Sequence, residues 1–482
     1  MDHKYEAVIG LEVHAQLSTK TKIFCGCSTA FIKEPNVNIC PICLGHPGVL
    51  PVLNKIAVEY IIKMGLAVNC RINQNSYFAR KSYFYPDLPK GYQISQYELP
   101  VCEEGFITIK GKNNENKKIR LTRIHLEEDA GKLIHGSNNS SYLDANRCGI
   151  PLIEIVSEPD LRSPDEAYQY LKKIKQIVQY LGICDGNMEE GSLRCDANVS
   201  IRKSGEKKLG TKTEIKNLNS FRNVERALTW EIERQIDLVD DGYSITQETL
   251  LWNDDLQEAV SMRSKEEAHD YKYFPEPDLP PLFISEEWKK EIFDLLPELP
   301  DVKYERFIND FKIPEYDAGI LTSSKPIADY YESIISYTKD YKSASNWLMV
   351  NISGYLNENK ISINEFIIPA KSIGKLIDFI NEGKISSKIA KDVFDFMLKN
   401  NKEPEEIIKE YNLVQLNNPD EIAVLIESIL EAYPNEVMQY RTGKEKVLGF
   451  FVGKVMKESK GKANPQLVNE ILKNKLNLIK HS

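Results

Sequence analysis

The sequence carries carboxylate and imidazole side chains in patterns that suit a divalent cation. Glu12 and His14 lie two positions apart in a stretch that alternates polar and apolar residues, so a strand here places both side chains on one face. Glu127, Glu128 and Asp129 follow one another just before a glycine turn. Alternation alone does not decide whether Glu127 or Glu128 shares a face with the other acids.

Two further segments add polar side chains to sequence that is typical of strands. Glu154 stands alone in an otherwise apolar run, and a buried carboxylate is costly unless it is paired or bound to a metal. A second alternating run places Arg194, Asp196 and Asn198 on one polar face. An ordinary ion pair explains each segment taken alone, whereas all four together predict a cavity lined with acids on strands.

A cavity of this kind suits Mg²⁺, which in turn holds the phosphates of ATP. That apparatus serves carboxyl activation, because phosphorylation gives a carboxylate a leaving group that ammonia can displace. Basic and polar side chains must then hold the transferred phosphoryl group. Our candidates are Lys81 and Lys90, from the basic and aromatic stretch 80–92, with Arg194 and Asn198. An aromatic packing loop explains that stretch equally well.

Familiar motifs for nucleotides and nucleophiles are absent from the sequence. It contains neither G-x-x-x-x-G-K-[ST] nor G-x-G-x-x-G, so any ATP is held by neither a P-loop nor a Rossmann turn. It also contains no G-x-S-x-G elbow. The chain therefore shows no machinery of its own to release ammonia from glutamine.

Four of the nine cysteines form two close pairs, Cys25 with Cys27 and Cys40 with Cys43. Short C-x-C and C-x₂-C loops let two thiolates reach one ion, and a tetrahedral zinc ion needs two such pairs. Four sulfur ligands leave no open position, so we predict structural zinc. The alternatives are four unrelated core cysteines or a redox C-x₂-C pair, although no thioredoxin-like pattern surrounds the pair.

The elements that must position these residues change along the chain. Strand and helix patterns mix up to about residue 275, and one amphipathic helix is predicted to begin at Ser163, with a capping box closed by Glu166, and to stop at Gly182. Proline clusters follow, and helical patterns dominate after residue 301. We therefore predict an α+β fold with a mixed-sheet domain at 1–297, a helical domain at 298–411 and a small all-α tail at 412–482.

Composition and charge restrict the classes of function. The chain has 482 residues, with 42% hydrophobic and 28% charged residues, which is ordinary for a globular protein of several domains. No apolar run reaches the roughly 18 residues of a membrane span, and the N-terminus resembles no targeting signal, so we expect a cytoplasmic protein without a membrane partner. The net charge of −9 argues against general wrapping of nucleic acid. Residues 441–480, with ten basic and three acidic side chains, are the expected place for any RNA contact.

Several motifs are long enough to be specific for a protein family. They are residues 9–14 (IGLEVH), 83–96 (YFYPDLPKGYQISQ), 126–132 (LEEDAGK), 151–160 (PLIEIVSEPD), 188–198 (MEEGSLRCDAN) and 460–465 (KGKANP). Together they closely resemble the B subunits of the tRNA-dependent amidotransferases, and the resemblance covers essentially the whole chain.

The resemblance implies a cradle domain, a helical domain and a tail similar to YqeY proteins. It implies a heterotrimer with an amidase A subunit, which frees ammonia from glutamine, and a small C subunit. It also implies that the chain uses ATP to phosphorylate the side-chain carboxylate of Glu on tRNA(Gln) or of Asp on tRNA(Asn), after which ammonia forms the amide. The expected class is a glutamine-dependent carbon–nitrogen ligase of translation.

The resemblance also implies site residues. Carried over position by position, the Mg²⁺ ligands are Glu12, His14, Glu128, Glu154 and Asp196. The four cysteines correspond to a zinc site that some family members retain, and the tail is expected to contact the body of the tRNA. Our candidates for that contact are Lys444, Lys454, Lys457, Lys460 and Lys462, although a solvated helix face explains any one of them equally well.

Two other functions compete with ATP-dependent activation. In a non-catalytic, zinc-bearing scaffold that binds tRNA, the acids are ordinary ion-pair partners. A metal-dependent hydrolase turns over ATP or another substrate without acyl-tRNA. Replacement of Glu154 separates the scaffold from an activating role, because a scaffold tolerates the change.

Overall fold

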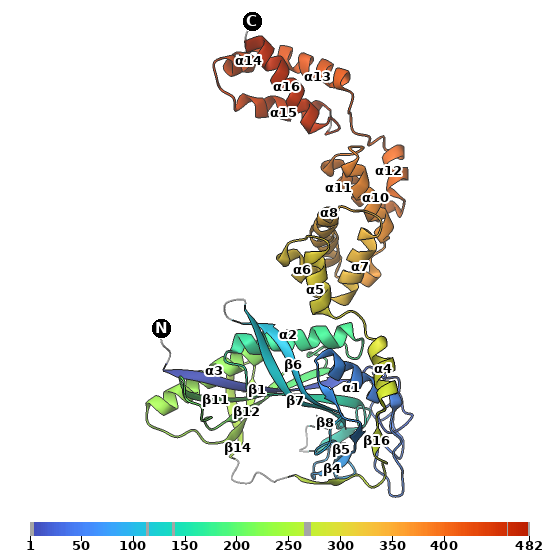
Figure 1. Cartoon of the computed structure of the whole chain (residues 1–482), viewed down its shortest axis with the longest axis vertical. Coiled ribbons are helices and arrows are strands. Elements are labelled where there is room, and N and C mark those ends of the chain that lie inside the picture. Colours follow the sequence, from blue (N-terminus) through green and yellow to red (C-terminus); the bar gives the residue numbers. More distant parts are fainter. Residues whose placement is uncertain (1–3, 112–114, 137–139, 265–270, 460, 481–482) are drawn as a thin grey trace. The chain divides into compact units, whose positions relative to one another are not determined.

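The computed structural model describes the chain except for residues 1–3, 112–114, 137–139, 265–270, 460 and 481–482. The chain divides into two compact units, Met1–Pro300 and Asp301–Ser482. The first mixes strands and helices, and the second is built of helices (Figure 1). This confirms the predicted α+β class, in which a large mixed sheet precedes an all-helical region.

Within the described residues, the first unit is built on a sheet of nine strands. Neighbouring strands run antiparallel, except for one parallel pair between residues 214–216 and 249–251. In spatial order the strands are β14 (Glu258–Ser264), β13 (Glu248–Asn253), β12 (Thr213–Leu218), β11 (Leu193–Lys203), β1 (Tyr5–Gln16), β10 (Pro151–Ser157), β7 (Asn116–Glu128), β6 (Cys102–Lys110) and β2 (Arg71–Ile72).

Helices cover one face of this sheet and bury its apolar side chains. They are α1 (Lys55–Ala67), α2 (Pro164–Tyr180) and α3 (Phe221–Asp240), and α4 (Glu286–Asp294) packs beside α1. Ile9, Leu11 and Val13 of β1 are at most 1% exposed and share one hydrophobic core with Leu171 of α2 and Ala227 of α3. Because side chains alternate along a strand, the residues between them in β1 point to the other face.

Short strands lie on the far side of the large sheet from α2 (Figure 1). In the described part of the chain they form three small sheets, with strand orders β15-β4-β5, β16-β3 and β8-β9. Their bounds are β3 (Asn75–Ser76), β4 (Ala79–Ser82), β5 (Tyr92–Ser95), β8 (Lys132–His135), β9 (Ser141–Asp144), β15 (Lys272–Pro275) and β16 (Leu282–Phe283).

Helix α2 begins where the sequence predicts. The side chain of Ser163 accepts a hydrogen bond from the backbone N–H of Glu166 at 3.2 Å, and Gly182, with a φ of +66°, follows the end of the helix. The Glu166 carboxylate has partners other than the predicted capping box. It accepts from the backbone N–H of Arg162 at 2.7 Å and pairs with Lys117 at 2.7 Å.

In the described part of the second unit, side chains form two hydrophobic cores, one from residues 307–407 and the other from 422–476. The predicted domain borders at 297/298 and 411/412 stay predictions. No helix of the described residues is long and apolar enough to cross a membrane. The elements are α5 (Pro300–Asn309), α6 (Glu315–Leu321), α7 (Lys325–Ile335), α8 (Tyr341–Asn346), the π-helix η2 (Trp347–Ile352), α9 (Ser353–Asn359), the 3₁₀-helix η3 (Ile363–Glu365), α10 (Ala370–Asn381), α11 (Ser387–Asn400), α12 (Pro404–Glu410), α13 (Pro419–Ala432), α14 (Pro434–Arg441), α15 (Val447–Glu458) and α16 (Pro465–Lys480).

The two faces of β10 give the first testable prediction. Ile155 lies in the core and is 0% exposed, whereas its neighbour Val156 is half-buried on the other face. We expect Ile155→Ala to lower the free energy of unfolding by about 2 to 5 kcal/mol, because it leaves a cavity. Val156→Ala is the control and is expected to lower it less. Urea unfolding followed by tryptophan fluorescence measures both, and equal losses contradict the assignment of faces.

Candidate active site and metal centre

The sheet face that is turned away from the helices collects four of the five predicted Mg²⁺ ligands. β1 lies between β10 and β11, and the register sets His14 opposite Glu154 and Glu12 opposite Asp196. Directly opposed residues share a face of a sheet, so these four side chains lie on the same side. We call this side the polar face.

Strand β7 adds His125 and Glu127 to the polar face. The Nε2 atom of His14 lies 3.3 Å from a carboxylate oxygen of Glu154 and 3.8 Å from one of Glu127. The Nε2 atom of His125 lies 3.6 Å and 3.8 Å from oxygens of the same two acids. His14, Glu127 and Glu154 offer ligand atoms that all lie within 4.8 Å of one another. His125 is not among the predicted site residues, although alternation two residues before Glu127 places it on the same face.

Glu128 is not part of this cluster, in contrast to the position that the resemblance implied. Adjacent residues of a strand point to opposite faces, so Glu128 leaves β7 on the side away from Glu127. It pairs with Lys90 and accepts a hydrogen bond from the backbone N–H of Ile94 at 2.7 Å. Lys90, a predicted phosphoryl contact, therefore also lies apart from the cluster. Of the two acids that the sequence left open, Glu127 shares the polar face with His14.

Glu12 and Asp196 form a second acidic pair beside the cluster. The amide of Asn198 donates to Glu12 at 3.0 Å. The ammonium of Lys216 donates to Asp196 at 2.9 Å and lies 3.1 Å from Glu214. Burial raises the pKa of Glu12, and the nearby carboxylates, Asp196 and Glu214 among them, raise it further. Burial and the neighbouring carboxylates both disfavour the charged form of Glu12, and a divalent cation bound nearby favours it.

Lys81 and Arg194 supply positive charge to the polar face. Burial favours the neutral form of Lys81, but Tyr273 and the acids Glu127 and Glu154 outweigh it and raise the pKa of the lysine. Arg194 lies opposite His14 in the register, and its Nη2 donates to Asp129 at 2.9 Å. The buried Nε of Arg194 has no hydrogen-bond partner among the described residues, so one strong donor is available to a ligand.

The carboxylate oxygens of the polar face fit a hard divalent cation, which prefers oxygen ligands. Burial disfavours the charged form of Glu154, yet His125, His14 and Lys81 hold the pKa of its carboxyl well below the usual range. Ligand atoms of octahedral Mg²⁺ lie about 2.1 Å from the ion and therefore about 3 to 4.2 Å from one another. The distances of 3.3 and 3.8 Å from His14 to Glu154 and Glu127 lie within that range.

A mainly apolar cavity of about 260 Å³ opens on the polar face next to Glu12. Its lining includes Val8 and Gly10 of β1 and Leu209 from the loop after β11. That loop approaches the sheet closely, because a Cβ added at Gly210 lies only 2.2 Å from a backbone oxygen. Strands rise about 3.3 Å per residue, so Gly10 and His14 are about 13 Å apart. A ligand bound beside Gly10 therefore reaches the cluster only if it extends about 13 Å along β1.

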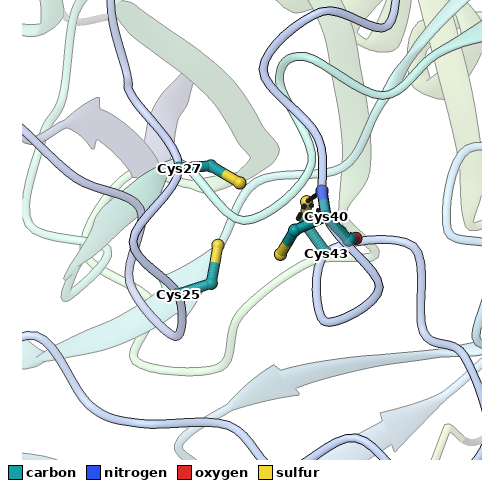
Figure 2. A group of neighbouring side chains, drawn as sticks. All are labelled: Cys25, Cys27, Cys40 and Cys43. Carbon is teal, nitrogen blue, oxygen red and sulfur yellow. Dashed lines mark hydrogen bonds between the residues drawn. The ribbon is translucent and has the colours of Figure 1, made fainter.

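The four paired cysteines converge as the sequence predicts. Figure 2 shows the sulfurs of Cys25, Cys27, Cys40 and Cys43 turned toward a common point, and all four lie within 4.8 Å of one another. The sulfurs of Cys40 and Cys43 are 3.8 Å apart. Zinc–sulfur bonds of about 2.3 Å in a tetrahedron require sulfurs about 3.8 Å apart, so the group fits zinc.

The cysteine cluster favours a thiolate at Cys43. A hydrogen bond from the Cys25 thiol outweighs burial and, with the backbone N–H of Cys40 and the charge of Lys22, lowers the pKa of Cys43 to about 4. Burial is the main cause that raises the pKa of Cys27 to about 11. Thiolates are the form that binds metal, so zinc must displace the protons of the remaining thiols.

The candidate tRNA contacts in the tail differ in their surroundings. Lys444 and Lys457 are exposed. Lys454 donates to the hydroxyl of Tyr433 at 2.8 Å, and Lys462 donates to a backbone carbonyl at 2.7 Å, so both also have partners inside the second unit. The remaining candidate, Lys460, lies outside the described residues.

Comparison with known proteins defines the class of this chain. Residues 7–290 match the GatB/GatE catalytic domain, and residues 329–476 match the GatB domain. The B subunit of an aspartyl/glutamyl-tRNA(Asn/Gln) amidotransferase from Thermodesulfovibrio yellowstonii is 56% identical over 97% of this chain and 98% of its own. Proteins of the same name from Chlorobium phaeobacteroides and Thermoanaerobacter sp. are 53% and 54% identical over 98% of this chain and 99% of their own.

The chain belongs to the family of aspartyl/glutamyl-tRNA(Asn/Gln) amidotransferase B subunits. The resemblance seen in its motifs is thereby confirmed, as is the expected class, a ligase subunit of translation. The roles of individual residues in metal, ATP and tRNA binding stay predictions.

The cysteine cluster gives the second testable prediction. We expect the purified chain to contain about one zinc ion and Cys40→Ser to lose most of it, because three sulfurs bind zinc less tightly than four. Cys184→Ser is the matched control, since Cys184 is a buried cysteine outside the cluster, and it is expected to retain zinc. Elemental analysis of the three proteins decides, and equal zinc contents contradict the assignment.

Proposed function

We propose that this chain is the ATP-dependent activating subunit of a tRNA-dependent amidotransferase. It phosphorylates the side-chain carboxylate of Glu on tRNA(Gln), of Asp on tRNA(Asn), or of both, and ammonia then forms Gln-tRNA(Gln) or Asn-tRNA(Asn). The observation that carries the proposal is the cluster of His14, Glu127 and Glu154 beside Glu12 and Asp196 on the polar face. The names of the relatives support the substrate class.

The reaction has two steps. A carboxylate oxygen of the acyl group attacks the γ-phosphorus of ATP, the bond from that phosphorus to the bridging oxygen breaks, and ADP leaves. Ammonia then attacks the carbonyl carbon of the acyl phosphate and loses a proton, and phosphate leaves as the amide forms. In the first step negative charge develops on phosphoryl and bridging oxygens, which fixed cations must stabilise.

We assign the residues of the polar face to binding and orientation. Glu12, His14, Glu127, Glu154 and Asp196 hold Mg²⁺, which when bound neutralises charge on the phosphates. Because these residues sit on four neighbouring strands of one sheet, they are held rigidly relative to one another.

Three further residues hold the phosphates and the acids in place. Lys81 and the unpaired Nε of Arg194 donate to oxygens of the γ-phosphoryl group, as the charge on that group requires. Asn198 holds the Glu12 carboxylate through its hydrogen bond. Lys90 is left out of this set, because it is paired with Glu128.

The apolar cavity beside Glu12 suits the base of the nucleotide. An aromatic base is best placed against apolar walls, and Val8, Gly10 and Leu209 provide them. With the base there, the γ-phosphate reaches the neighbourhood of His14 and Glu154, about 13 Å along β1.

The remaining parts of the proposal concern partners. An amidase A subunit supplies the ammonia, because the chain carries no nucleophile motif for glutamine hydrolysis, and a small C subunit completes the heterotrimer. The basic tail binds the tRNA body, and the exposed Lys444 and Lys457 are its foremost contacts. The complex works in the cytoplasm, where translation takes place.

Replacement of Glu154 tests the activating role. We expect Glu154→Gln to slow the formation of phosphorylated acyl-tRNA by at least about 100-fold while tRNA binding stays unchanged. Glu233→Gln, on the exposed side of α3, is the control and is expected to remain active. The measurement uses the reconstituted complex with ATP and each misacylated tRNA. Normal activity of Glu154→Gln favours the non-catalytic scaffold instead.

The position of the base gives a separate test. Gly10→Val places a branched side chain in the lining of the cavity, and its first atom fits, because a Cβ at Gly10 meets nothing closer than 3.7 Å. We expect ATP to bind about tenfold more weakly, whereas inorganic tripolyphosphate with Mg²⁺ binds as before. Calorimetric titration of both ligands measures this. Equal weakening of both, or of neither, contradicts a base in this cavity.

A further inference from the structure

Lys22 is a buried cation that takes no part in the proposed reaction. The residue is 0% exposed. Its ammonium donates to the backbone carbonyls of Asn38 at 2.7 Å and Ala145 at 3.2 Å, and it forms no ion pair with a carboxylate of the described residues. A buried ammonium is costly when carbonyl dipoles are its only partners, and a nearby negative charge stabilises it.

The cysteine cluster lies beside this lysine. The backbone N–H of Lys22 donates to the carbonyl of Cys27 at 2.9 Å. A Cβ added at Gly149 lies 3.7 Å from the Cδ of Lys22 and 3.8 Å from the Cβ of Cys43, so both side chains border the same space at Gly149. Ala145, which accepts from the ammonium, packs in one small apolar cluster with Cys43. Lys22 thus joins the segments that hold both cysteine pairs.

We propose that Lys22 is the internal counter-cation of the four-cysteine zinc site. Four thiolates around Zn²⁺ leave a net charge of about −2, which is unfavourable inside a protein unless positive groups lie close by. The ammonium of Lys22 neutralises part of that charge, and the zinc site supplies the counter-charge that the buried lysine needs. The inference rests on the proposed zinc site.

The pairing of Lys22 with the zinc site also affects residues outside the cysteine-bearing loops. Lys22, Cys25 and Cys43 line a cavity of about 280 Å³ whose wall also includes Lys90 and Glu128. Glu128 is the direct neighbour of Glu127, which belongs to the polar face. Loss of zinc therefore leaves the buried ammonium of Lys22 without a negative partner. This unpaired charge lines the same cavity as Glu128, the last residue of β7.

Zinc release from the full-length chain tests the charge of Lys22. We expect Lys22→Met, which keeps the stem and removes the charge, to release zinc to a chelating dye roughly 10- to 100-fold faster. Lys22→Gln is expected to do the same, although its amide can still donate to the carbonyls. Lys20→Met is the matched control, because Lys20 is exposed and two residues away. Release from Lys22→Gln at the wild-type rate assigns the lysine to hydrogen bonding alone and overturns the proposal.

A comparison of thermal unfolding separates charge compensation from simple packing. Wild type, Lys22→Met and Lys22→Gln are each unfolded in the zinc-loaded and the metal-free state. We expect the substitutions to lower Tm more in the zinc-loaded protein, because the negative cluster is then present. An equal decrease in both states identifies a purely structural lysine and overturns the proposal. A wild-type chain without stoichiometric zinc refutes the zinc site itself and is recognised before any variant is made.

Discussion

The alternation of side chains along β1 is the constraint on which the site depends. Ile9, Leu11 and Val13 are buried against the helices, so Glu12 and His14 must point the other way. A slip of one residue in the register would move the apolar side chains out of the core, so burial fixes the register with β10 and β11. The hydrophobic core thereby determines which acids meet on the opposite face.

The polar face holds charge that the fold alone does not balance. Lys81, Lys216 and Arg194 offset part of the negative charge, while burial and the nearby carboxylates raise the pKa of Glu12. Such a surface is unfavourable for stability and suits a cation with a phosphate chain. The apolar core on the other side of the same strands compensates for that cost.

The features that the sequence predicted correctly depend on residues close together in the chain. The start of α2 at Ser163 follows from its cap, and the cysteine cluster follows from two short loops. Contacts between segments that are distant in the chain could not be predicted from the sequence. Glu166 pairs with Lys117, which is 49 residues away, and the choice of Glu127 over Glu128 depends on how β7 pairs with β10. No pattern within one segment encodes such pairings.

The adjacent acids Glu127 and Glu128 of β7 link the imidazole–carboxylate cluster to the cavity beside the cysteine cluster. Glu127 lies in the imidazole–carboxylate cluster, and Glu128 pairs with Lys90 at the cavity that Cys25 and Cys43 also line. Successive side chains of a strand point to opposite faces, so the direction in which Glu128 points determines the direction in which Glu127 points. The cysteine-bearing loops, which form another wall of that cavity, therefore support the end of β7. With the proposed zinc bound, the cysteine cluster thereby influences the geometry of the polar face without contacting it.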